Sequence, residues 1–334
     1  MTFVKQHCLA VSKGVFYFPV CALLFALWTP LQAQQRVKIP RLGAFLYSNP
    51  DSDPNFAAFR QGLRELGYVE GENLVMEHHF AGGRPQRLPE LATELVSSNP
   101  DVIAALGGDV VPFAQKSTKT IPIVMWVSND PVKAGFVASL ARPGGNITGV
   151  TLILDELAGK RLALLKEVIS QIYRVAVLWN PDHADPEFKE IQREAKALDV
   201  RIQSLEVRRG EDFDSQFQNL AKGHPDAIII VSSRLMQDNR RHILEFAAKQ
   251  RLPVIGDWGR WTHDGALLSY GPDTTKLAAR MATYVDKILK GAKAGDLPIE
   301  RPSKFELVIN LKTAKQIGLT IPANVLARAD RVIK

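Results

Sequence analysis

The chain has 334 residues, of which 46% are hydrophobic and 23% are charged, and its net charge is +7. This composition is typical of a globular protein and excludes a collagen-like, coiled-coil or largely disordered chain. The length predicts about two domains, and charges of both signs are interspersed, which favours a solvated surface over nucleic-acid binding.

Residues 1–33 have the layout of a cleavable signal peptide. Lys5 and Lys13 precede an apolar run at 14–28, which is shorter than the ~20 residues that span a bilayer. Ala33 provides a small residue at the expected cleavage site. Both cysteines lie in this segment, so the mature chain has no thiol for a disulfide, a nucleophile or a metal ligand. We therefore expect export to the periplasm.

Short apolar strands then alternate with amphipathic helical stretches. Such alternation predicts right-handed βαβ units around a parallel sheet. The expected elements of the first set are strands at 42–47, 74–78, 102–106 and 121–125, with helices at 56–66, 88–96 and 110–116.

The same order of elements begins again near residue 174. An Asn-Pro-Asp turn follows the first strand of each set, a Pro-Asp pair precedes each third strand, and a proline opens each fourth strand. Chance matches are an alternative, because these residues favour turns, but the shared order favours a repeated α/β lobe. The second set comprises strands at 174–179, 201–207, 227–231 and 253–255, with helices at 186–198, 213–221 and 238–250.

Two similar lobes predict a hinge with a cleft between them. A further helix at 275–289 would complete the first lobe, and a strand at 305–310 would return to the second. The expected fold class is α/β, with two doubly wound Rossmann-like lobes joined by a hinge. The expected lobe 1 is 34–149 plus 271–303, and lobe 2 is 150–270 plus 304–334.

Several strings resemble the periplasmic substrate-binding proteins of an ABC transporter group related to tryptophan-binding lipoproteins. The most specific is Arg142-Pro143-Gly144-Gly145-Asn146-Ile147-Thr148-Gly149, and others lie at 59–73, 121–124, 130–132, 269–271, 287–298 and 305–314. The resemblance implies the type I periplasmic binding protein fold. It also implies a receptor without catalysis or cofactor that delivers a small solute, such as an aromatic amino acid, to the transmembrane subunits of an ABC permease. A monomer is expected.

Ligands of open parallel sheets bind outside the carboxyl ends of the strands. The short polar groups at these ends suit a zwitterion or carboxylate. The candidate ligand-binding residues are Ser48, Asn49, Gly107, Gly108, Asp109, Ser128, Asn129, Asp130, Asn180, Asp182, Ser232, Ser233, Arg234, Asp257, Trp258 and, at a hinge crossing, Tyr270.

Each candidate also has a structural interpretation. Arg234 is either a carboxylate clamp or a solvated residue at a helix start. Members of the family that this sequence resembles often carry a small hydroxyl residue near the position of Asp109. Asp109 is either a helix cap or a cleft residue that favours an amine. Trp258 and Trp126 either stack on a ligand or pack in the core, and Tyr270 fits a hinge turn.

Other functional classes find less support. The histidines of the mature chain form no metal-binding spacing, and neither a His-Glu-x-x-His string nor a nucleophile elbow occurs in the sequence. We therefore expect neither an enzyme nor a metal site. The main alternative is a periplasmic protein that reports its ligand to a membrane receptor instead of feeding transport.

Overall fold

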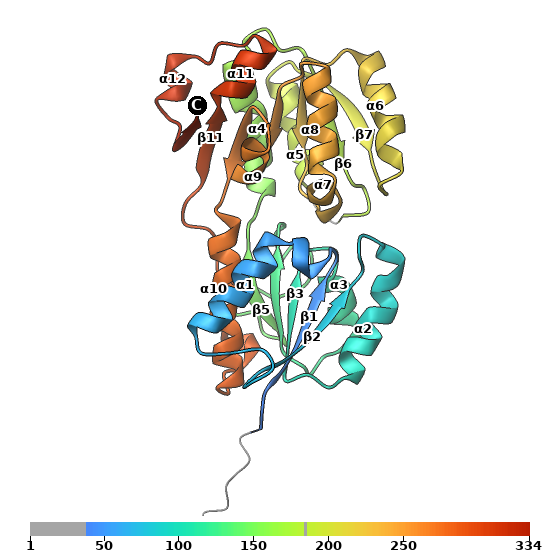
Figure 1. Ribbon diagram of the computed structural model, residues 1–334, viewed down its shortest axis with the longest axis vertical. Coiled ribbons are helices and arrows are strands. Elements are labelled where there is room, and N and C mark those ends of the chain that lie inside the picture. Colours follow the sequence, from blue (N-terminus) through green and yellow to red (C-terminus); the bar gives the residue numbers. More distant parts are fainter. Residues whose placement is uncertain (1–37, 184–185) are drawn as a thin grey trace, which may run out of the picture. The chain divides into compact units, whose positions relative to one another are not determined.

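The computed structural model describes residues 38–183 and 186–334, and residues 39–334 form one compact unit. The signal peptide expected at 1–33 lies outside the described residues. Within this unit the strands form two separate sheets (Figure 1). Among residues 38–183 and 186–334, no helix is both long enough and apolar enough to cross a membrane.

The first sheet has five parallel strands in the order β2-β1-β3-β4-β5. Strand β1 lies second from one edge, where Ala44 pairs with His78 of β2 on one side and with Ala104 of β3 on the other. The chain therefore winds outward from β1 in both directions. The strands are β1 (Arg41–Leu46), β2 (Val75–Phe80), β3 (Val102–Leu106), β4 (Ile123–Val127) and β5 (Ile147–Thr151).

Both faces of this sheet are covered by helices (Figure 1). Alternate residues of β1 point to opposite faces, so Ala44 packs towards α1 and α10 whereas Phe45 packs towards α2 and α3. The contact between α1 and α10 is close, because a Cβ on Gly62 would lie 2.6 Å from the carbonyl oxygen of Ala279. The helices are α1 (Pro54–Glu65), α2 (Leu88–Ser97), α3 (Val111–Ser117) and α10 (Thr274–Leu289).

The second sheet has seven strands in the order β12-β11-β10-β9-β8-β6-β7. All neighbours are parallel except β10 and β11, which pair antiparallel. The strands are β6 (Arg174–Trp179), β7 (Arg201–Glu206), β8 (Ala227–Ile230), β9 (Val254–Gly256), β10 (Leu268–Gly271), β11 (Glu306–Asn310) and β12 (Arg331–Ile333).

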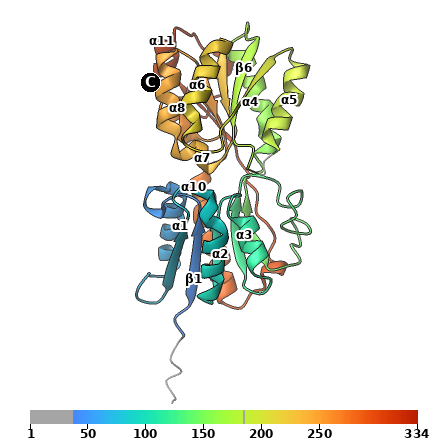
Figure 2. The same ribbon diagram turned by 90° about the vertical axis from the view of Figure 1, so that its right-hand side faces the viewer.

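Helices α4 and α5 cover one face of the second sheet, and α6 and α8 cover the other (Figure 2). Between α4 and α5, the fully buried Arg161 forms an ion pair with the fully buried Glu187. The longer helices are α4 (Asp155–Val168), α5 (Glu187–Ala197), α6 (Asp212–Gly223) and α8 (Arg240–Lys249). The short ones are α7 (Arg234–Asp238), α9 (Gly259–His263), α11 (Leu311–Ile317), α12 (Ala323–Leu326) and the 3-10 helices η1 (Pro50–Ser52), η2 (Pro85–Arg87) and η3 (Ala294–Asp296).

The expected class of two doubly wound α/β lobes is confirmed. The helix expected at 238–250 is observed as α8, and a short helix that was not expected, α7, precedes it and ends at Asn239. The backbone of Asn239, at φ −98° and ψ 11°, lies outside the helical region and ends α7. The sequence analysis also missed β5 and α4. The chain passes from one to the other through Ile153, whose φ of 45° is rare for a β-branched residue.

Candidate ligand-binding site

A buried ion pair joins the two lobes at the ends of their strands. Nη1 of Arg234, the first residue of α7, lies 2.8 Å from Oδ2 of Asp53, and the two side chains are 7% and 3% exposed. Asp53 is the N-cap of α1 and accepts hydrogen bonds from the amides of Asn55 and Phe56. The interpretation of Arg234 as a solvated residue is therefore wrong. Its Nη2 is buried and has no hydrogen-bond partner among the described residues.

A pair of stacked tryptophans adjoins this arginine. The guanidinium carbon of Arg234 lies 4.8 Å from the ring centre of Trp126, which is the distance of a cation–π contact. Trp126, on β4, stacks on Trp258, the N-cap of α9, with ring centres 5.7 Å apart and planes at 21°. Both rings are buried, and neither indole nitrogen has a hydrogen-bond partner within the described part of the chain. Trp126 therefore contacts both the cation of Arg234 and the ring of Trp258.

Asp109 makes a second contact between the lobes. Nδ1 of His183 donates to Oδ1 of Asp109 at 2.7 Å, and Nε2 of the same ring lies 3.2 Å from Oγ of Ser128. The helix-cap interpretation of Asp109 is wrong, because the N-cap of α3 is Val110 and its first turn has no side-chain cap. Burial alone would raise the pKa of Asp109, but His183 and then Arg234 outweigh it and hold that pKa below its ordinary value.

Gly107 and Gly108 make room for these side chains. Gly107 has a φ of 126°, which favours glycine, and its Cα faces Arg234, since a Cβ there would lie 3.6 Å from Nε. A Cβ on Gly108 would lie 3.1 Å from Cε1 of His183. The glycine pair thus allows the close approach of two side chains from the other lobe.

A third polar contact joins Ser48 with Asp238. The Ser48 hydroxyl lies 2.7 Å from Oδ2 and 2.9 Å from Oδ1 of Asp238, at the end of α7. Burial raises the pKa of Asp238, although this hydroxyl and Arg234 act in the opposite direction. Seven expected residues are thus brought together: Ser48, Gly107, Gly108, Asp109, Ser128, Arg234 and Trp258.

The remaining candidates lie in other surroundings. Asn49 caps η1, and Asn180 accepts from the amide of Asp182, which pairs with Arg208. Asn129 accepts a hydrogen bond from Thr151 through its carbonyl oxygen, and Tyr270 lies on β10 beside Phe305. Ser232, Ser233 and Asp257 are buried at the ends of β8 and β9, where Ser233 caps α7 and Gln237 donates to Asp257.

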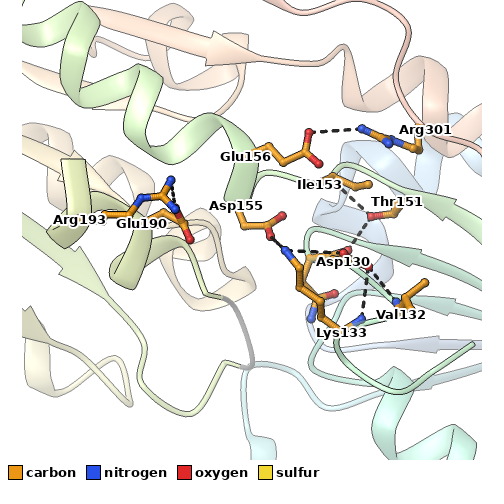
Figure 3. A network of polar contacts seen from close by, with 11 residues as sticks. Asp130, Val132, Lys133, Thr151, Ile153, Asp155, Glu156, Glu190, Arg193 and Arg301 are labelled. Atoms are coloured by element: carbon orange, nitrogen blue, oxygen red, sulfur yellow. Dashed lines mark hydrogen bonds and ion pairs between the residues drawn. The ribbon is translucent and has the colours of Figure 1, made fainter. Parts of the chain in front are cut away.

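Asp130 belongs to a network at the hinge (Figure 3). Nζ of Lys133 lies 3.7 Å from Oδ2 of Asp130 and 3.3 Å from Oδ2 of Asp155, the first residue of α4. These ion pairs raise the pKa of Lys133. Arg301, before β11, pairs with Glu156 at 3.3 Å. Ion pairs therefore hold two of the segments that pass between the lobes, one at the start of α4 and one before β11.

The sequence analysis missed Asp53 and Asp238. The signal for Asp238 was its spacing, because a residue four positions after Arg234 lies on the same side of a helix. Asp53 was treated only as part of a repeated turn, although an aspartate before a proline is typical of a helix N-cap. The contacts of Asp53 with Arg234 and of Asp238 with Ser48 could not be predicted from the order of residues in the chain.

An open pocket of about 790 Å³ adjoins this cluster. Asp53, Arg234 and Trp258 line it, together with the start of α8, helix α9 and the crossing segment 271–275. Groups of three or more potential metal ligands do not occur in residues 38–183 and 186–334. Around a cavity large enough for a small organic solute, the site therefore combines the cation of Arg234, the ring of Trp258 and carboxylates.

Comparison with known proteins gives a consistent result. A family model described as "ABC transporter substrate binding protein" matches residues 45–333. A curated "Tyrosine-binding protein" of Clostridioides difficile (strain R20291) is 25% identical over 276 residues, which is 82% of this chain and 79% of the relative. The family is one of binding proteins, so the expectation that this chain is not an enzyme is confirmed.

Two solved structures are similar along most of this chain. A conserved domain protein from Vibrio cholerae O1 biovar El Tor has a TM-score of 0.82 and 28% identity, and covers 88% of this chain and 100% of its own. An ABC domain in complex with L-Trp from Streptococcus pneumonia has a TM-score of 0.79 and 22% identity, and covers 88% and 99%. The likeness to the second structure supports the fold.

Proposed function

We propose that this chain, which belongs to the family of ABC transporter substrate binding proteins, captures an amino acid or another aromatic or carboxylate-bearing solute between its lobes. It would then deliver the solute to the transmembrane subunits of an ABC permease. The observation that carries the proposal is the buried Arg234, which lies over Trp126 with one guanidinium nitrogen lacking an acceptor. Such a group suits a carboxylate beside an aromatic surface.

Each part of an amino acid has a chemical counterpart in this cluster. Nη2 of Arg234 is available to the carboxylate, and the faces of Trp126 and Trp258 suit an aromatic side chain. Oδ2 of Asp109 is buried without a hydrogen-bond partner in the described part of the chain, and a carboxylate held ionised there suits an ammonium group. The tyrosine and L-Trp named for two relatives support the same ligand class.

The direct contacts between lobes suggest how binding acts on the molecule. A solute that touches Arg234 and Trp126 bridges the two sheets, so it stabilises the arrangement in which they meet. The lobes we assign are 34–149 plus 271–303 and 150–270 plus 304–334. We further propose that residues 1–33 direct the chain to the periplasm and that the mature protein is a monomer there. Measuring the mass of the exported protein tests both the cleavage and the oligomeric state. The match to a transport family does not favour the sensing alternative.

The decisive experiment is a thermal-shift screen of residues 34–334, unfolded and refolded to remove carried solute. The panel holds amino acids, aromatic carboxylates, nucleosides, sugars and polyamines. We expect a shift of several degrees that is confined to amino acids and carboxylates, since a ligand that binds only the folded state raises its stability. A shift confined to sugars, nucleosides or polyamines would contradict the proposed ligand class.

Calorimetric titration of variants then tests the site. Arg234→Ala should weaken carboxylate binding on the order of 10- to 100-fold, because a charge-assisted hydrogen bond is lost. Arg234→Lys keeps the charge beside the buried Asp53 but loses the planar fork, so it separates ligand contact from stability. Arg208→Ala, at a pair whose side chains are 50% and 60% exposed, is the matched control. Unchanged affinity in both Arg234 variants would remove Arg234 from the site.

A further inference from the structure

The pocket beside Arg234 extends to a second group of cations. Its lining also includes Arg240 and Arg241 at the start of α8 and Arg260 on α9. Arg240 is neutralised, because its Nε lies 2.6 Å from Oδ2 of Asp264. Arg241 and Arg260 form neither an ion pair nor a hydrogen bond with any residue that the structure describes. These two guanidinium groups therefore have no direct ion-pair partner, although the charges of Asp264 and Asp53 reach Arg260.

The carboxylates on the same wall are already engaged. The lining carboxylates are Asp53, which pairs with Arg234, Asp264, which pairs with Arg240, Asp273, which caps α10 and pairs with Lys276, Asp238, which accepts from the Ser48 hydroxyl, and Glu306, which lies 3.9 Å from Nζ of Lys304. The donors of this pocket thus exceed the acceptors that are free to receive them. An acceptor supplied from outside would redress that imbalance.

Electrostatics place the cations close to one another. Burial, followed by the charge of Arg240 and more weakly that of Arg241, lowers the pKa of Arg260, while Asp264 and Asp53 act in the opposite direction. Like charges held at one site repel each other, and an anion bound between them removes that repulsion. A solvated arginine far from other cations would gain little from an anion.

A buried donor independently points to the same kind of ligand. Arg234, which is 6% exposed, lines this pocket and leaves Nη2 without an acceptor. Trp258 is also 6% exposed and leaves its indole nitrogen unpartnered within the described ranges. Both buried donors line the pocket, and so do Arg241 and Arg260, which are exposed. The pocket is therefore lined by both buried and exposed donors.

We propose that Arg241 and Arg260 form an anion subsite for a second negative group of the solute, so that the solute is an amino acid with a carboxylate or phosphate on its side chain. This inference rests on the proposed function, because it assumes that the α-carboxylate occupies Arg234. It differs from that function in requiring an anionic side chain. The tyrosine and L-Trp named for the relatives have neutral side chains.

The test is calorimetric titration of the solute-stripped mature protein with two matched pairs of probes. L-glutamate is compared with L-glutamine, and O-phospho-L-tyrosine with L-tyrosine. The anionic member of at least one pair should bind about ten-fold or more tightly than its neutral partner, because each added charge-assisted hydrogen bond strengthens binding. The difference should shrink in 0.5 M salt, since exposed charges are screened.

Variants then locate the effect. Arg241→Gln and Arg260→Gln should lower the affinity for the anionic probe and leave that for its neutral partner unchanged. Arg193→Gln, on α5 with a side chain 77% exposed and outside the pocket, is the control that should change neither.

Several outcomes overturn the inference. Equal affinities within both pairs, or equal losses for both members in the two variants, would leave the proposed function standing and refute the subsite. Failure of every amino acid and carboxylate in the wider screen would refute the proposed function itself.

Discussion

Nδ1 of His183 lies 2.7 Å from Oδ1 of Asp109, and the two residues belong to different lobes. Through Nε2 the same imidazole also approaches Ser128, at the end of the neighbouring strand β4. One side chain of the second lobe therefore contacts the ends of two adjacent strands of the first. This contact between two titratable side chains therefore helps to hold the two lobes in their relative position.

Replacement of Asp109 by Asn should make the stability of the ligand-free protein less sensitive to acid. Because the folded pKa of Asp109 is held below its ordinary value of 3.8, the carboxylate stabilises the fold above that value. This stabilisation is lost as the pH falls through the lowered folded pKa. In urea unfolding at pH 7, the free energy of unfolding of the wild type should exceed that of Asp109→Asn by about 1–3 kcal/mol. This difference should become smaller below pH 4. An equal gap at pH 7 and pH 3 would contradict the assignment.

Replacement of Gly108 by Ala should weaken ligand binding through contact with His183. The added Cβ would lie 3.1 Å from Cε1 of that ring, so the ring or the lobes must shift by a few tenths of an ångström. We expect affinity to fall several-fold while the urea midpoint changes little, since strain of this size costs about 1 kcal/mol. Gly145→Ala is the control, because a Cβ there meets nothing within 4 Å. Similar affinities for the two variants would show that Gly108 does not limit closure.

Tryptophan fluorescence should report ligand binding through the stacked pair. Trp126 contacts both Trp258 and Arg234, so a ligand that binds beside them changes the surroundings of both rings. Trp126→Phe and Trp258→Phe should each remove most of the ligand-induced change. Trp179→Phe should keep it, because Trp179 stacks on Phe188 in the second lobe. An undiminished signal in the first two variants would place the ligand elsewhere.

The ion pair between Arg161 and Glu187 should be costly to break from one side. Both side chains are fully buried, so Arg161→Met leaves an unpaired charge and should lower the free energy of unfolding by about 3–5 kcal/mol. Lys133→Ala is the contrast, because that side chain is 67% exposed and its loss should cost less than about 1 kcal/mol. Urea unfolding at pH 7 measures both. Equal costs would show that burial does not govern the strength of these pairs.

Sequence patterns predicted the strands more accurately than the site. The strand at 102–106 is observed with the expected bounds, because its continuous apolar run is buried on both faces. The strand-end rule also placed Ser48 and Arg234 correctly at the ends of β1 and β8. Their partners could not be predicted, because Ser48 and Asp238 are 190 residues apart in the chain. Such pairs depend on how two complete lobes meet.

The close packing of α10 on α1 has a consequence for how the molecule folds. The first sheet is complete at β5, but one of its faces stays partly uncovered until α10 has been made, well over a hundred residues later. At roughly 5–20 residues per second, synthesis of the intervening chain takes roughly six to thirty seconds. The second sheet likewise lacks β11 and β12 until the last part of the chain emerges. Neither lobe can therefore reach its final core during most of translation, and the newly made chain stays open to factors that bind unfolded polypeptide.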